Sequence, residues 1–107
     1  MLDGAVPLSA HVQTNTGQKL GSCGGEALNK VSLIGRSDRA RYPMLYGVDP
    51  YSDTTFNALQ MEMLREEVLV IEAETQDAAV AEMAAQLLVL VEKVTGGVHR
   101  TLVFIGD

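Results

Sequence analysis

The side chains best suited to chemistry are concentrated in one polar segment, residues 46–60. Carboxylates there can transfer protons, and tyrosine and amide side chains can hold a ligand or a partner through hydrogen bonds. The candidate binding residues are Tyr46, Asp49, Tyr51, Asp53, Asn57 and Gln60. Two interpretations are open. The loop binds or catalyses, or it is structural, with Asp49 and Asp53 bonding backbone amides at a turn and at a helix start.

The segment does not have the spacing of a metal site. With Asp49 as the first position, a calcium loop needs glycine at the sixth and glutamate at the twelfth, where this sequence has Thr54 and Gln60. Other carboxylates and a histidine follow no established ligand spacing. These are Asp53, Glu62 and His99. We therefore predict neither a metal nor a cofactor.

A set of short motifs runs through the same segment and the C-terminus. They are Asp49-Pro50-Tyr51, Asp53-Thr54, Phe56-Asn57 and Leu59-Gln60, followed by Phe104-Ile105-Gly106-Asp107. Together they resemble a widespread family of small uncharacterised bacterial proteins. The resemblance covers residues 43–64 and the C-terminus, leaves the N-terminal third outside, and implies no activity, because no function is assigned to that family.

A nucleophile could be sought at Cys23, with His11 or His99 as its base. The surrounding Gly21-Ser22-Cys23-Gly24-Gly25 matches neither a nucleophile elbow nor a phosphate-binding loop. A lone cysteine also cannot form an internal disulfide. We predict a flexible turn with an inert thiol.

Charged clusters have structural explanations as well. Arg36, Arg39 and Arg41 lie together beside Asp38. They balance acidic helices within the fold or bind an anionic ligand, and the first interpretation is favoured. A second cluster, predicted to be a solvated helix face, consists of Glu62, Glu66 and Glu67.

Composition limits the domain count and the partners. A chain of 107 residues fits a single domain, residues 1–107. Residues 1–50 contain five Lys and Arg and four Asp and Glu, whereas residues 51–107 contain three Lys and Arg and ten Asp and Glu. The formal charge of −6 therefore comes from the second half. This charge argues against nucleic acid and against an anionic membrane surface. Residues 1–10 carry no basic region and no apolar run approaches about 20 residues, so we expect a cytoplasmic protein.

The first half of the sequence predicts strands. Residues 6–13 alternate, with Leu8, Ala10 and Val12 on one side and His11 and Gln13 on the other. A turn at residues 14–17 would return the chain as the second arm of a hairpin over residues 18–23. Residues 30–34 are a candidate third strand, and residues 35–53, rich in Pro and Tyr, form a connection.

The second half predicts two helices and a strand. One helix begins at Asp53 or Thr54, and its expected apolar positions are Phe56, Leu59, Met63, Leu64, Val68 and Ile71. Thr75 is the candidate N-cap of a second helix. The apolar stripe of this helix, one face of regularly spaced apolar residues, consists of Val80, Met83, Ala84, Leu87, Leu88, Val91 and Val94. Gly96-Gly97 ends it, with a glycine expected in a left-handed C-cap. Residues 98–105 form a covered, central strand.

The predicted fold is α+β: an N-terminal β-hairpin and a C-terminal strand in a small, mainly antiparallel sheet, with two consecutive helices packed on one face. For function, the sequence favours a non-enzymatic acidic protein-interaction module of immunity-protein or adaptor type, with a protein partner. One alternative is a small enzyme or ligand-binding protein with a pocket around Asp49, Tyr51 and Asp53. Another is a structural homo-oligomer, a homodimer paired through the second helix.

Overall fold

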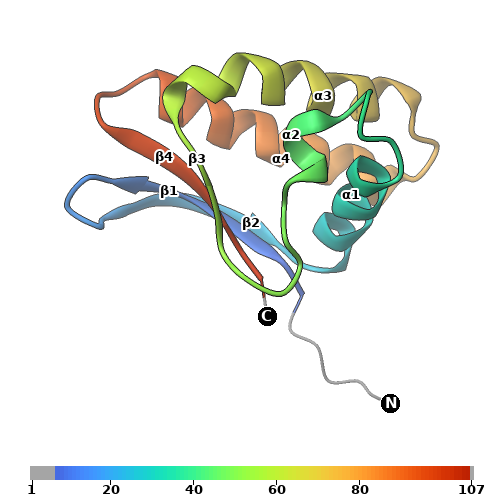
Figure 1. Ribbon diagram of the computed structural model, residues 1–107, viewed down its shortest axis with the longest axis horizontal. Helices are drawn as coiled ribbons and strands as arrows, with labels where there is room; N and C mark the ends of the chain where they lie inside the picture. The colour runs from blue at the N-terminus through green and yellow to red at the C-terminus, as the bar shows by residue number, and fades with distance from the viewer. Residues whose placement is uncertain (1–6, 107) are drawn as a thin grey trace.

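A four-stranded antiparallel sheet forms one layer of the protein, and helices form the other (Figure 1). This computed structural model describes residues 7–106. The strands are β1 (Ser9–Thr14), β2 (Lys19–Gly24), β3 (Thr54–Phe56) and β4 (Arg100–Ile105), in the order β2-β1-β4-β3. The helices are α1 (Glu26–Arg36), α2 (Pro43–Tyr46), α3 (Met61–Glu74) and α4 (Ala78–Thr95), with a short 3-10 helix η1 (Ala58–Gln60) before α3. The predicted α+β class, with its hairpin and C-terminal strand, is confirmed.

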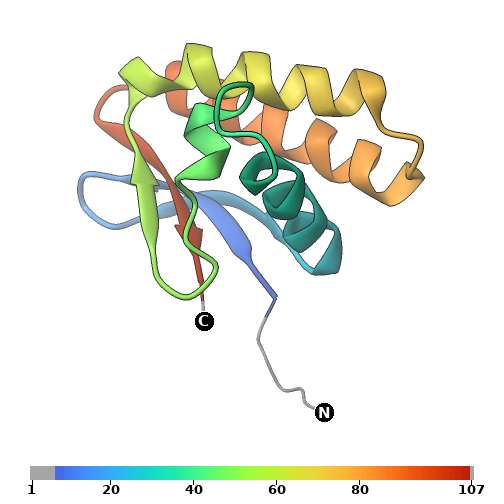
Figure 2. The same ribbon diagram turned by 45° about the vertical axis from the view of Figure 1, so that its right-hand side comes forward.

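All the helices lie over one face of the sheet (Figures 1 and 2). Ala10 and Val12 of β1 are fully buried beneath them, and the alternation of a strand sends His11 and Gln13 to the opposite, uncovered face. The predicted alternation is therefore correct from Leu8 onward. Val6, which the prediction included, lies outside the described residues. Strand β4 is central, between β1 and β3, as predicted, but helices cover only one of its faces, and Val103 and Ile105 lie on the other.

Helix α4 provides more buried core residues than any other helix. Its buried residues are Val80, Met83, Ala84, Leu87, Leu90, Val91 and Val94, close to the predicted stripe, and Leu88 is partly buried. The helix packs along α3 and across β1, β2 and β4. These side chains are buried within a single chain. They therefore do not form the dimer interface that the sequence suggested for the second helix.

The predicted start of the first helix is wrong. Thr54 and Phe56 belong to strand β3, and the Phe56 ring meets the Phe104 ring of β4 edge to face, with 5.8 Å between centroids. The helical turn begins only after β3, and within α3 the predicted positions Leu64, Val68 and Ile71 are buried. Leu59 and Met63, which were expected to be buried, are 92% and 50% exposed.

Two helices occur where the sequence predicted a strand and a loop. Residues 30–34 are part of α1, whose buried residues are Leu28, Val31, Ser32 and Gly35. These four recur at helical spacing, but the flanking glycines and the β-branched Val31 and Ile34 favoured a strand. Within the predicted connection, Pro43 opens α2 at a position where its missing N–H costs nothing.

The ends of α4 differ from the prediction. Its N-cap is Asp77, whose Oδ1 accepts hydrogen bonds from the N–H groups of Ala79 (2.9 Å) and Val80 (3.4 Å). Thr75, the predicted cap, ends α3 instead. At the other end Gly96 has φ −79 and is not left-handed. Among the described residues, no helix is long and apolar enough to cross a membrane.

Candidate functional site

The turn at residues 49–52 is fixed by its own polar groups. The Asp49 carboxylate accepts hydrogen bonds from Tyr51 N–H (2.8 Å) and from the Ser52 hydroxyl (2.9 Å). Asp49 N–H donates in turn to the hydroxyl of Thr54 (3.0 Å). The bond from Tyr51 N–H, then that from Ser52, holds the pKa of Asp49 below its ordinary value. Both oxygens of this carboxylate are thus used inside the loop, and its lowered pKa makes it a poor proton acceptor.

The C-terminal strand closes on this turn. Gly106 N–H donates to the Ser52 carbonyl (3.1 Å), continuing the ladder in which Thr54 pairs with Phe104. A Cβ at Gly106 would lie 2.5 Å from Ser52 N and 2.8 Å from Asp49 O, so only glycine fits. The two separate motifs of the sequence, at residues 49–57 and 104–106, are therefore parts of one structural unit. Asp107 lies outside the described residues.

Asn57 and Gln60 cap a helix. The Asn57 side chain accepts a hydrogen bond from Gln60 N–H (3.2 Å), and the Gln60 side-chain oxygen accepts one from Asn57 N–H (2.8 Å). This reciprocal arrangement is a capping box, which satisfies backbone donors at the start of η1. Strand β3 separates this cap from the turn at residues 49–52. The six predicted site residues do not form a single pocket.

Asp53 is exposed and does not cap the helix that the sequence assigned to it. Ser52 and Thr54 face β4 in the ladder. Because backbone groups alternate in direction along a strand, those of Asp53 point to the free edge. A charged side chain on an exposed sheet edge opposes pairing with another strand. Asp53 therefore lies at the exposed edge of the sheet, directly before β3.

Tyr51 has no such structural role. Its side chain is 77% exposed, although its own N–H helps to hold the turn. Tyr46, at the end of α2, is 43% exposed. The Arg39 guanidinium lies 5.7 Å from the centre of the Tyr46 ring, within the range of a cation–π interaction. Tyr51 thus presents a largely exposed ring on a turn that other residues hold.

The arginines Arg36, Arg39 and Arg41 mainly interact with other groups of the same fold. Arg41 pairs with Glu74 of α3 and lies over the Tyr42 ring, 5.5 Å from its centre. Arg36 contributes weakly to the lowered pKa of Asp49. With Arg39 over a tyrosine ring, these contacts support the interpretation that the cluster balances local charge and aromatic faces.

A buried carboxylate, Glu67, was missed. We predicted that Glu67 lies on a solvated face, but it is 5% exposed. Its two oxygens accept hydrogen bonds from Met44 N–H (2.9 Å) and Leu45 N–H (3.0 Å), the orphan donors at the start of α2. The available signal was its place in the helix, next to Val68 and one turn from Ile71, on the apolar side. Glu67 ties the segment that carries Tyr46 to the core.

The arrangement around Cys23 agrees with an inert thiol, but Cys23 lies in strand β2 and not in the flexible turn that we predicted. Cys23 pairs with Ala10 and packs against the core, and burial raises the pKa of the Cys23 thiol to about 11. His11 pairs with Ser22, so it lies on the opposite face of the sheet and cannot act as the base. Over residues 7–106, no three His, Cys, Asp or Glu side chains are grouped as metal ligands.

Comparison of the chain with protein-family models, with curated proteins and with solved structures found no match.

Proposed function

We propose that this protein is a non-enzymatic interaction module, of immunity-protein or adaptor type, that contacts a protein partner through the turn at residues 49–52. One observation carries the proposal: Tyr51 is 77% exposed on a turn whose other polar side chains hold the turn itself. Tyrosine is enriched at interface hot spots, because its ring supplies a large rigid area and its hydroxyl a hydrogen bond.

The turn is ordered before any partner arrives. Asp49, Thr54 and Gly106 fix it from three directions. A loop that is already ordered loses little conformational entropy on binding, which strengthens an interface of modest size. Tyr46 on α2, which Glu67 anchors, offers a second half-exposed ring.

The charge of the chain suggests the kind of partner. A formal charge of −6 attracts a basic protein and speeds its encounter, while it repels acidic ones. Catalysis is less well supported, because Asp49, the carboxylate best placed to act as a base, has both oxygens occupied. The interaction module is therefore favoured over a small enzyme.

A site-specific cross-linking experiment tests the proposal. A photoreactive phenylalanine analogue is placed at position 51 in the source cells, and in a separate variant at position 33. Leu33, on α1, is 66% exposed and serves as the matched control. We expect a defined heterologous adduct from position 51 and none from position 33. Equal adducts from both positions, or none from position 51, would contradict the proposal.

A further inference from the structure

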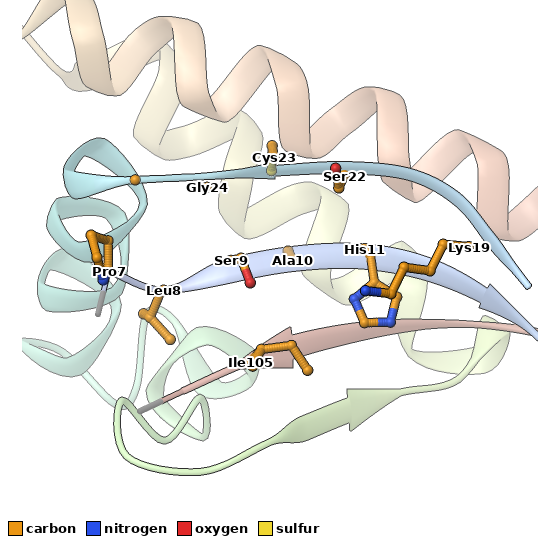
Figure 3. Close-up of a pocket in the computed structure, with 11 residues that line it drawn as sticks. Pro7, Leu8, Ser9, Ala10, His11, Lys19, Ser22, Cys23, Gly24 and Ile105 are labelled. Atoms are coloured by element: carbon orange, nitrogen blue, oxygen red, sulfur yellow. The ribbon is translucent and has the colours of Figure 1, made fainter. Parts of the chain in front are cut away.

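We propose that the uncovered face of the sheet binds a phosphate group, in a shallow hollow lined by His11, Lys19, Ser9 and Ser22. The hollow has a volume of about 600 Å³. It lies over β1 and β2, with Ile105 of β4 at its margin (Figure 3). This site is separate from the turn at residues 49–52 and does not depend on the function proposed for that turn.

The residues that line the hollow include Lys19 and no carboxylate, in contrast to the acidic chain as a whole. The strand registers place ten residues on the uncovered face. They are Ser9, His11, Gln13, Lys19, Ser22, Gly24, Thr55, Thr101, Val103 and Ile105. None of these ten is a carboxylate, although the whole chain carries 14 Asp and Glu. Asp53, two residues before Thr55, continues the same face beyond β3 but does not line the hollow. Lys19 forms no ion pair with a described residue. An anion is therefore the ligand that the face attracts.

An irregularity in β2 brings the polar groups together. Lys19 and Ser22 are three residues apart and would point to opposite faces of a regular strand. The register shifts between His11 and Gln13, so that Ser22 pairs with His11 while Lys19 pairs with Gln13. Both side chains consequently lie on the face of His11, and Figure 3 shows Lys19 extending towards the His11 ring. Bulges commonly redirect side chains in this way.

This bulge is held in place from the other side of the sheet. Gly21 has φ +152, a conformation that L side chains rarely adopt, and a Cβ there would lie 3.3 Å from Leu90 of α4. The Leu20 carbonyl, at the bulge, accepts a hydrogen bond from Lys93 Nζ of α4 (3.1 Å). Helix α4 thus fixes the backbone that presents Lys19 and Ser22.

His11 supplies an unused polar atom inside the hollow. Its side chain is 5% exposed, and its Nε2 lies 3.0 Å from Gln13 Oε1. Because an amide oxygen only accepts, Nε2 carries the proton of this bond, and Nδ1 is the free acceptor of the neutral ring. Nδ1 has no partner among the described residues. A buried acceptor without a partner is costly and uncommon, which points to a ligand that donates to it.

A phosphate group matches these partners better than other oxyanions. Its oxygens accept from an ammonium group and from hydroxyls, as Lys19, Ser9 and Ser22 provide. Inorganic phosphate carries at least one P–OH donor at neutral pH, and a phosphate monoester, whose second ionisation lies near pH 6, carries one in a fraction of its molecules. That hydroxyl can donate to Nδ1 of His11. Sulfate carries no such proton and makes one hydrogen bond fewer.

The chain has two histidines, which makes a direct test simple. Protein labelled with ¹⁵N in the histidine rings is titrated with inorganic phosphate at constant pH and ionic strength. We expect saturable shifts of the His11 signals and none of the signals of His99, which is exposed on a different segment. Sulfate should bind about tenfold more weakly, equivalent to one charge-assisted hydrogen bond. Glycerol 3-phosphate, compared with the free ion, identifies whether the natural source is a phosphate ester or phosphate itself.

Matched substitutions separate a site from general attraction. Lys19→Met should raise the dissociation constant for phosphate about tenfold or more. Lys30→Met removes the same charge from the ion pair with Asp77, elsewhere on the surface, and should leave binding unchanged. Absence of saturable His11 shifts, equal effects of the two substitutions, or equal binding of sulfate would overturn the proposal. So would a dimer in solution that Lys19→Met dissociates, because the face would then bind a second copy.

Discussion

Replacing Glu67 by glutamine should strongly destabilise the protein. The buried carboxylate accepts two backbone hydrogen bonds, from Met44 and Leu45. Glutamine has the same shape as glutamate, but only one of its two terminal groups is an oxygen acceptor. One buried backbone N–H therefore loses its partner and faces the side-chain NH2 group, which is itself a donor. An unsatisfied buried donor costs about 1–3 kcal/mol, and more where the lost bond was charge-assisted. We expect a loss of about 2–3 kcal/mol in the free energy of unfolding.

The assay is thermal and urea unfolding of Glu67→Gln beside Glu66→Gln. For a domain of this size, about 2–3 kcal/mol corresponds to a decrease of about 10 °C in melting temperature. Glu66 is the exposed neighbour on the same helix, and its substitution should change stability by no more than about 0.5 kcal/mol. Hydrogen exchange should also become faster at Met44 and Leu45. If the two variants have the same melting temperature, the buried carboxylate does not anchor α2 and the reasoning is refuted.

Three further outcomes follow from particular contacts. Gly35→Ala should destabilise by about 1–3 kcal/mol in urea unfolding, because its Cβ would lie 2.5 Å from Leu45 Cβ where α1 meets α2; a neutral result would mean that these helices separate freely. The Cys23 thiol, whose pKa burial raises to about 11, should react slowly with Ellman's reagent in the folded protein and quickly once unfolded; equal rates would contradict the burial. The pKa of Asp49 is lowered in the fold, so its stabilising contribution is present above the ordinary carboxyl pKa and is lost as pH falls through the folded value. Asp49→Asn should therefore weaken the loss of stability as the pH falls below the ordinary carboxyl pKa, and an unchanged loss would show that the turn does not depend on this charge.

The sequence predicted the parts of the fold that depend on local periodicity. Alternation in β1 placed Ala10 and Val12 inside, and the three- and four-residue spacing of Val80 to Val94 identified α4. Helix α1 was missed because glycines at both ends and β-branched residues between them favour a strand as readily as a short helix. The start of α3 was misplaced because Asp53, like Asn57, is a residue type that caps helices.

Most of the candidate site depends on contacts between segments that are distant in the sequence. The spacing of apolar residues along one segment does not reveal such contacts. Glu67 meets α2 only because α2 and α3 pack together. Gly106 reaches Ser52 because β4 pairs with β3. The bulge that turns Lys19 and Ser22 to one face depends on support from α4. The types of residue at 49–60 indicated a structured polar loop, but their separation into a turn and a helix cap required the fold.

The Tyr51→Ala variant tests most directly whether Tyr51 serves recognition rather than stability. The melting temperature and the capture of the partner identified by cross-linking are measured on the same preparation. A side chain that is 77% exposed contributes little to the core. We predict a melting temperature within about 2 °C of the unsubstituted protein. Partner affinity should fall about tenfold or more, as expected for a hot-spot aromatic residue. A melting temperature lowered as far as in the core variant Leu87→Ala, or undiminished capture of the partner, would contradict the account.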